Sequence, residues 1–179
     1  WATGGGIWRW DSDRLQLFCT EEIKAIADEC ALVGIPLYAH SYNNFDAAYD
    51  CVRFGCKQLI HGFEIDERTM KLMAEQGTFF TPTIGFLRTY PPDWTPELDA
   101  FPGETVVEKG LARTYDNLRK AYDMGITITI GSDSFSFVTP YGYVTIDEMY
   151  DFVEKVGISI LDTVAAATYN GAKMLGKEN

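Results

Sequence analysis

The 179 residues are enough for one domain with a substantial core, and 46% hydrophobic with 23% charged residues is ordinary for a folded globular protein. The formal net charge of −11 excludes a general nucleic-acid binder, which needs a basic face, and disfavours binding to an anionic membrane surface. No stretch is apolar over the length of a membrane span, so we expect neither a nucleic-acid nor a membrane partner.

The cysteines and the N-terminal residues indicate in which cellular compartment the protein is expected. Cys19, Cys30, Cys51 and Cys56 form no C-x-x-C pair. Cys30 and Cys51 fall on apolar faces of expected helices, which favours buried reduced thiols over metal ligands or disulfides. The N-terminal residues lack the pattern of a secretory signal. We expect a cytoplasmic protein.

A unit of helix, glycine and short apolar run occurs four times along the chain. The runs end at His40, at His61, near Thr83 and at Asp133. The glycine that precedes each run stands where a helix should end in a left-handed residue. These glycines are Gly34, Gly55, Gly77 and Gly125. Strands that alternate with helices predict a parallel sheet with right-handed crossovers.

The last of these runs has the most regular pattern. Residues 126–130 alternate Ile and Thr, which suits a half-buried strand. A strand inside a barrel is also possible, provided that the Thr hydroxyls find hydrogen-bond partners. A long helix is expected before it, over about residues 104–124.

Helix starts are indicated by capping residues. Thr20 is expected as the N-cap of the first helix. Thr145 and Glu148 have the spacing of a capping box for a later helix, and Ser159 and Asp162 have the same spacing for the last one.

Two architectures fit the alternation, a doubly wound sheet and a (β/α)8 barrel. No Gly-rich phosphate loop follows a strand, which weakens the doubly wound, ligand-binding alternative. The long segments 87–103 and 134–144 suit a lid or substrate wall, and equally a packed surface loop.

The two histidines of the chain, His40 and His61, and Asp133 end three different runs. The carboxyl ends of parallel strands converge, so these side chains can meet. Imidazole and carboxylate bind zinc and similar ions, which activate water, and a nearby carboxylate can transfer the proton. A single His at a strand end is more often structural, and Asp133 could be a cap, but the shared position of both histidines favours ligands.

The runs in this order resemble part of the amidohydrolase superfamily, specifically its imidazolonepropionase-like and Xaa-Pro dipeptidase (prolidase-like) branch. "PLYAHSYN", "LIHG", "TFFTPTIG" and "ITIGSDS" resemble strands five to eight, "WATGGG" the turn after strand four, and "LDTVAAATYNGAKMLG" the closing helices. The resemblance implies an α/β fold in which residues 1–179 form the C-terminal half of a (β/α)8 TIM-type barrel with parallel strands, from the strand-four turn through the closing helices.

The resemblance also implies roles for single residues. His40 and His61 would bind the second metal, or be the outer ligands of a single one. Asp133 would bind the first metal and act as general base and acid. The cofactor would be one or two divalent ions, with zinc expected. Tyr42 could contact substrate or be a packed aromatic, and Arg88 could bind a substrate carboxylate or be a solvated loop charge.

The sequence departs from the family pattern in several places. The H-x-H motif of strand one and the bridging lysine, usually carboxylated, are absent. Ile60 stands where the family often has Glu, and "GSD" replaces the commoner "GTD". The chain therefore supplies only half of a binuclear site.

These observations lead to two functional hypotheses. The first is a metal-dependent hydrolase of amide, peptide or cyclic amide bonds that uses metal-activated water on a small-molecule or peptide-like substrate. The second is a catalytically incomplete fragment, structural or metal-binding only, because the H-x-H motif and lysine are missing. Half a barrel has open strand edges, so we expect a homo-oligomer or a need for the missing N-terminal half.

Overall fold

The computed structural model describes residues 16–42, 44–63, 65–85, 106–134 and 141–178, with side chains from residue 111 onward in the fourth range. Arg88, the segment 87–103 and the Gly-rich first residues lie outside this part of the chain. The elements are α1 (Thr20–Leu32), β1 (Tyr38–Ser41), α2 (Phe45–Arg53), β2 (Gln58–His61), α3 (Glu67–Gln76), β3 (Phe79–Thr81), α5 (Val106–Asp123), α6 (Tyr143–Asp151), the π-helical turn η2 (Phe152–Val156), α7 (Ile160–Ala167) and α8 (Tyr169–Met174).

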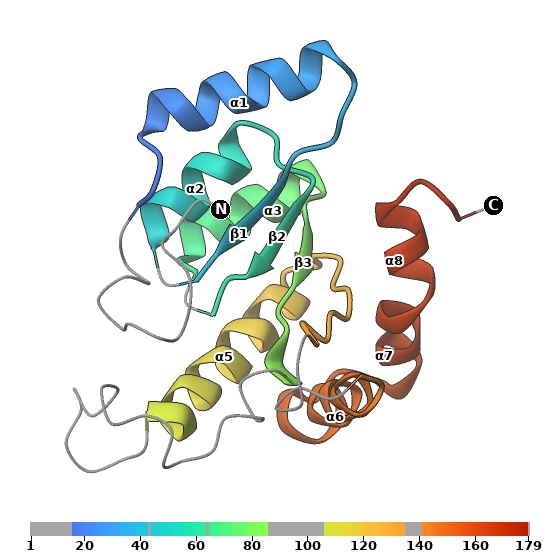
Figure 1. The fold of residues 1–179 in the computed structure, drawn as a ribbon. Helices are drawn as coiled ribbons and strands as arrows, with labels where there is room; N and C mark the ends of the chain where they lie inside the picture. The colour runs from blue at the N-terminus through green and yellow to red at the C-terminus, as the bar shows by residue number, and fades with distance from the viewer. Residues whose placement is uncertain (1–15, 43, 64, 86–105, 135–140, 179) are drawn as a thin grey trace.

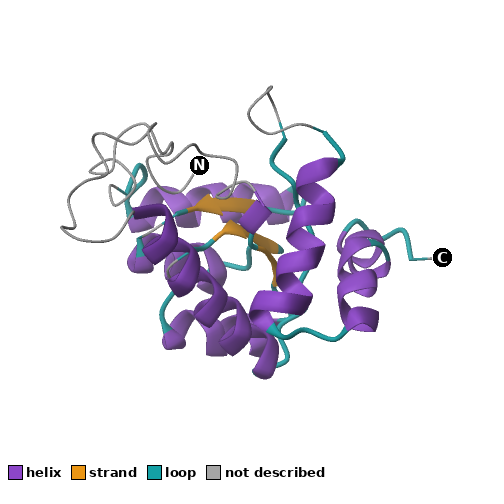
Figure 2. Ribbon diagram, turned by 90° about the horizontal axis from the view of Figure 1, so that it is seen from below, coloured by secondary structure: helices purple, strands orange, loops and turns teal. Residues whose placement is uncertain are grey.

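The strands form a parallel sheet in the order β1-β2-β3, with helices packed around it (Figures 1 and 2). In the register, Ser41 lies opposite His61, and Leu59 lies opposite Phe80. The strand order follows the chain order, as expected when each crossover is a helix of the same hand. The predicted parallel α/β arrangement is confirmed for these strands.

The Ile/Thr run 126–130 lies beside β3 but does not form a regular strand. Ile128 makes an isolated parallel bridge with Phe80, whose N–H donates to Thr127 O (3.0 Å) and whose carbonyl accepts from Thr129 N (2.8 Å). The N–H of Ile130 donates to Ala166 O of α7 (3.1 Å). The ladder with β3 stops here because the next residue on the β3 side that would donate is Pro82, which has no N–H.

A row of buried polar side chains crosses three neighbouring segments. Gln58 Nε2 donates to Thr81 Oγ1, and Thr81 Oγ1 hydrogen-bonds Thr129 Oγ1. The threonine hydroxyls therefore have the partners that burial requires. For Thr129 this satisfies the condition under which the alternating run can lie inside a barrel.

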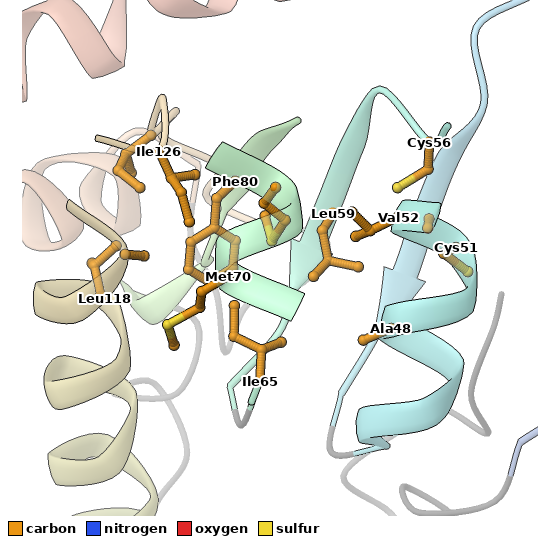
Figure 3. Close-up of a cluster of buried hydrophobic side chains, with 14 of the residues drawn as sticks. Ala48, Cys51, Val52, Cys56, Leu59, Ile65, Met70, Phe80, Leu118 and Ile126 are labelled. Carbon is orange, nitrogen blue, oxygen red and sulfur yellow. The ribbon is translucent and has the colours of Figure 1, made fainter. Parts of the chain in front are cut away.

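The apolar face of the sheet packs against α2, α3 and α5. Figure 3 shows Leu59 of β2 and Phe80 of β3 between helices, with Met70 of α3 and Leu118 of α5 against Phe80. Each of these side chains is at most 2% exposed. The core therefore holds the strands in register from one side and leaves their C-terminal ends for polar groups.

Several expected helix ends are confirmed and two are wrong. The four glycines before the runs all have positive φ, and Ser159 caps α7 by accepting from Asp162 N. The N-cap of α1 is Cys19 rather than Thr20, which is the first helical residue. The capping box at Thr145 is wrong, because α6 already begins at Tyr143 and places Glu148 in the buried helix interior.

The four thiols are free, as expected. Cys51 and Cys56 are buried, Cys30 is half-buried and Cys19 is exposed. Burial raises the pKa of Cys51 to about 12, so this thiol is protonated and unreactive at neutral pH. Within the described residues, no helix combines the length and apolarity needed to cross a bilayer.

The core arrangement predicts a large effect of Phe80→Ala. The side chain is fully buried, so we expect the free energy of unfolding to fall by about 3–5 kcal/mol. Leu161→Ala, at a residue that is 82% exposed, should change it by no more than about 0.5 kcal/mol. Urea unfolding followed by circular dichroism measures both, and similar losses in the two variants would contradict this placement of the core.

Candidate metal centre

The two histidines meet at the C-terminal ends of adjacent strands. His40 on β1 and His61 at the end of β2 have ring centroids 4.5 Å apart, with planes at 78°. They come together because Ser41, the neighbour of His40, lies opposite His61 in the parallel register. Strand pairing thus places the backbones of these two expected ligands side by side.

The backbone at the strand ends is unusual. Among the described residues, the non-glycine residues with positive φ are His61 (69°), Thr83 (52°) and Asp133 (47°). Each follows or ends one of three successive runs, and such residues cost of order 1–3 kcal/mol each. Strict alternation would turn His61 to the same face as Leu59, toward the helices, but its ring meets His40 instead. The left-handed backbone of His61 goes with this turn of its side chain away from the helices.

Thr83 fixes the ring of His61. A hydrogen bond of 2.6 Å joins His61 Nδ1 and Thr83 Oγ1, and both residues are buried. With Nδ1 engaged, Nε2 is the ring nitrogen that can bind a metal ion. The sequence pointed to Thr83 only as the end of the third run, and its role as partner of His61 was missed.

Aromatic side chains enclose the histidine pair. Tyr42 is 5% exposed, stacks on His61 at 4.5 Å with planes at 13°, and meets His40 edge-on at 4.7 Å. Phe63 lies 5.2 Å from Tyr42 and 5.5 Å from His61. This is the packing role weighed for Tyr42 in the sequence, and a substrate contact for it stays a proposal.

Asp133, the third expected ligand, does not join the two histidines in a group of three. It is half-buried after the run that pairs with β3, and burial raises its carboxyl pKa. Across the described ranges, no three His, Cys, Asp or Glu side chains are grouped closely enough to hold a metal ion. His40, His61 and Asp133 therefore do not form a complete three-ligand group within this part of the chain.

Comparison with known proteins identifies the family. Residues 16–179 match the sequence model of the amidohydrolase family. The chain belongs to the amidohydrolase family. This agrees with the resemblance noted in the strand-end motifs.

Relatives of this amidohydrolase chain are larger proteins. It is 29% identical over 184 residues to ochratoxinase of Aspergillus niger, covering 99% of this chain and 35% of that protein. It is 25% identical over 180 residues to an uncharacterized protein of Mycobacterium tuberculosis, covering 99% and 47%. The chain thus spans about a third to a half of the length of these relatives.

Two solved enzyme structures share the fold of this chain. A Xaa-Pro dipeptidase with bound methionine has a TM-score of 0.78 and 26% identity, covering 99% of this chain and 43% of that one. The structure of A. niger ochratoxinase has a TM-score of 0.79 and 26% identity, covering 97% and 38%. The parallel α/β fold of the amidohydrolase chain therefore matches one part of these enzymes.

Both histidines of the amidohydrolase chain are neutral at physiological pH. Burial lowers the pKa of His40 to about 4, and burial together with the neighbouring His40 lowers the pKa of His61 well below 6.5. Neutral imidazole is the form that binds a metal ion. Both imidazoles are thus in the protonation state that metal binding requires.

These pKa shifts predict a pH dependence of stability in metal-free protein. The unfolded chain binds more protons on its histidines below pH 6.5, so their contribution to the free energy of unfolding falls as the pH falls toward 4. For His40, which is only partly buried, solvent screening reduces this effect, and the loss should be on the order of 1 kcal/mol at pH 4. Denaturant unfolding of wild type and His40→Gln at several pH values isolates this contribution, since the carboxyl groups are common to both. Parallel pH profiles would contradict it.

The bond between His61 and Thr83 predicts a specific effect of Thr83→Val. The substitution keeps the shape but leaves Nδ1 of a buried ring without its partner, so we expect a loss of about 1–3 kcal/mol in unfolding free energy. Nuclear magnetic resonance of the His61 ring should also change. Thr83→Ser keeps a hydroxyl and should retain the ring signals, and a Ser variant as altered as the Val variant would speak against the bond.

Proposed function

We propose that this chain is the C-terminal half, about strands five to eight, of a (β/α)8 barrel in a metal-dependent hydrolase of amide, peptide or cyclic amide bonds. The observation that carries the proposal is the contact between the rings of His40 and His61 at adjacent strand ends, with His61 fixed by Thr83. Family membership and the parallel strand order support it.

In this proposal His40 and His61 hold zinc, as one of one or two divalent ions. Both imidazoles are neutral, and Nε2 of His61 is the nitrogen left for the ion. When bound, the ion supplies Lewis-acid activation of water. The histidines would orient it, while Tyr42 and Phe63 cover the buried ring of His61.

Asp133 is proposed as a further ligand and as the general base and acid. Its position at the end of the run beside β3 suits a group that faces the same end of the sheet as the histidines. Burial already raises its carboxyl pKa, which makes it a better proton acceptor than a solvated carboxylate.

The substrate class follows from the relatives. Their names, ochratoxinase, Xaa-Pro dipeptidase and prolidase, suggest an amide or peptide bond in a small-molecule or peptide-like substrate. Tyr42 and Arg88 are proposed as substrate contacts, Arg88 through a bidentate pair with a carboxylate.

The chain is proposed to work with further barrel strands. Within the described residues β1 pairs with β2 alone, and the neighbouring apolar side chains of Leu32, Val33 and Ile35 are exposed. An N-terminal half that carries the H-x-H motif and the lysine would cover this edge, and self-association is the alternative. A cytoplasmic location stays a prediction.

A second candidate function is a structural or metal-binding remnant without catalysis. The absence of a three-ligand group across the described ranges favours it for the isolated chain. The two candidates agree on zinc binding by the histidines and differ on hydrolysis.

Zinc binding with His61→Ala as a variant tests both candidates at once. Equilibrium dialysis against zinc, followed by metal analysis, should show affinity for the wild type that falls at least about tenfold in His61→Ala. Cys19→Ser is the control, because its exposed thiol is another place where zinc could bind. Equal zinc in wild type and His61→Ala would contradict the metal centre.

Hydrolysis then separates the two candidates. The zinc-loaded chain is assayed on prolyl dipeptides and on ochratoxin, with His61→Ala as the blank. Turnover that depends on His61 supports the hydrolase. Zinc binding without turnover in the chain alone supports the remnant.

A further inference from the structure

Glu148 is a buried acid that the proposed chemistry does not use. It lies in the interior of α6, and its side chain is 0% exposed. Neither carboxyl oxygen makes a hydrogen bond of normal geometry within the part of the chain that the structure describes. A buried carboxyl group without a full set of partners is costly, so its position calls for a compensating interaction.

Three backbone N–H groups face this carboxyl group. Burial raises the pKa of Glu148 well above its ordinary value, the N–H groups of Ile84, Gly131 and Gly85 act to lower it, and Asp151 raises it slightly. Ile84 and Gly85 come directly after Thr83, and Gly131 comes two residues before Asp133. The acid therefore faces the backbone beside two of the left-handed residues at the strand ends.

Two glycines allow α6 and the strand ends to approach this closely. A Cβ on Gly85 would lie 2.6 Å from Val144 O of α6 and 3.2 Å from Glu148 Cβ. A Cβ on Gly131 would lie 2.5 Å from Thr81 Cγ2 and 3.3 Å from Thr83 Cγ2. Any side chain at either position would push the three segments apart, so the backbone contact is a built feature of the fold.

We propose that Glu148 is a positioning residue, whose buried carboxyl group draws together the backbone of residues 84–85 and Gly131 and so sets the placement of Thr83 and Asp133. The part concerning metal binding rests on the proposed function. Its effect on the metal site runs through Thr83, which holds the His61 ring, and through the turn that carries Asp133.

The residue acts by converging dipoles. Backbone N–H groups from two chain segments act on one carboxyl group of α6, and the close approach of Gly85 to Val144 and Glu148 brings α6 against the end of β3. Thr83 and Asp133 both have left-handed backbone, which persists only where the surroundings enforce it. Glu148 helps to hold the backbone of Thr83 and Asp133 in this conformation.

The test compares Glu148→Met, which keeps the volume but removes both acceptors, with Glu148→Gln, which keeps one carbonyl oxygen. The control is Tyr115→Phe, because Tyr115 Oη donates to the buried Asp151 on the same helix (3.0 Å) and its loss should lower stability without touching the strand ends. In metal-free chain, nuclear magnetic resonance follows the amides of Ile84, Gly85 and Gly131 and the His61 ring.

We expect hydrogen exchange at these three amides to be at least about tenfold faster in Glu148→Met, with a shifted His61 ring signal. Glu148→Gln should restore most of both, and Tyr115→Phe should leave them as in wild type. Unchanged amides and ring in Glu148→Met, or the same changes in Tyr115→Phe, would overturn the proposal. Should Glu148→Met not fold, Glu148→Asp, which withdraws the carboxyl by one methylene, takes its place with the same expected changes.

Cobalt binding gives a second readout. Visible absorption of Co²⁺ bound to the chain reports ligand geometry, and we expect Glu148→Met to change the spectrum and weaken affinity about 10–100-fold, with rescue by Glu148→Gln. If wild type binds no Co²⁺, the metal proposal fails while the amide and ring signals still decide the positioning role. If Co²⁺ binds identically to all variants and the amides are unchanged, the positioning role is wrong and the metal proposal survives.

Discussion

The left-handed backbone at the strand ends is the constraint on which the rest of the site depends. A regular strand would continue to alternate its side chains, and His61 would then face the helices beside Leu59. Because His61 has a φ of 69°, its ring instead meets the ring of His40 and hydrogen-bonds Thr83. The backbone of Thr83 is left-handed as well. The fold thus gives up some backbone stability at these positions in order to gather polar groups at one end of the sheet.

Both faces of the sheet help to hold the strand ends that carry the histidines in place. The helix-facing side is apolar and tightly packed around Phe80, which fixes the register. The other side carries the hydrogen-bonded row of Gln58, Thr81 and Thr129, which satisfies buried polar groups below the histidines. The register matters for the site because the ends of β1 and β2, which carry His40 and His61, lie side by side in this pairing.

The proposed ligand set of the chain is partial, and the chain also spans only part of the length of its relatives. The described residues bring two imidazoles together without completing a group of three, and the chain covers 35% and 47% of two relatives. A barrel that draws ligands from strands far apart in sequence divides its metal centre between its halves. The exposed apolar residues near β1 fit the same division, because they are the surface that further strands would cover.

The sequence by itself determined the helix–glycine–strand repeat, the positions of His40 and His61 at strand ends, and the family. These depend on local signals, namely apolar runs and glycines that end helices, which neighbours in the chain specify. The tertiary structure alone decided that residues 126–130 pair through one bridge, that Thr83 holds His61, and that Glu148 is buried rather than a cap. Each depends on contacts between segments more than 20 residues apart, such as Ile130 with Ala166, and no local pattern records which distant donor or acceptor a group will meet.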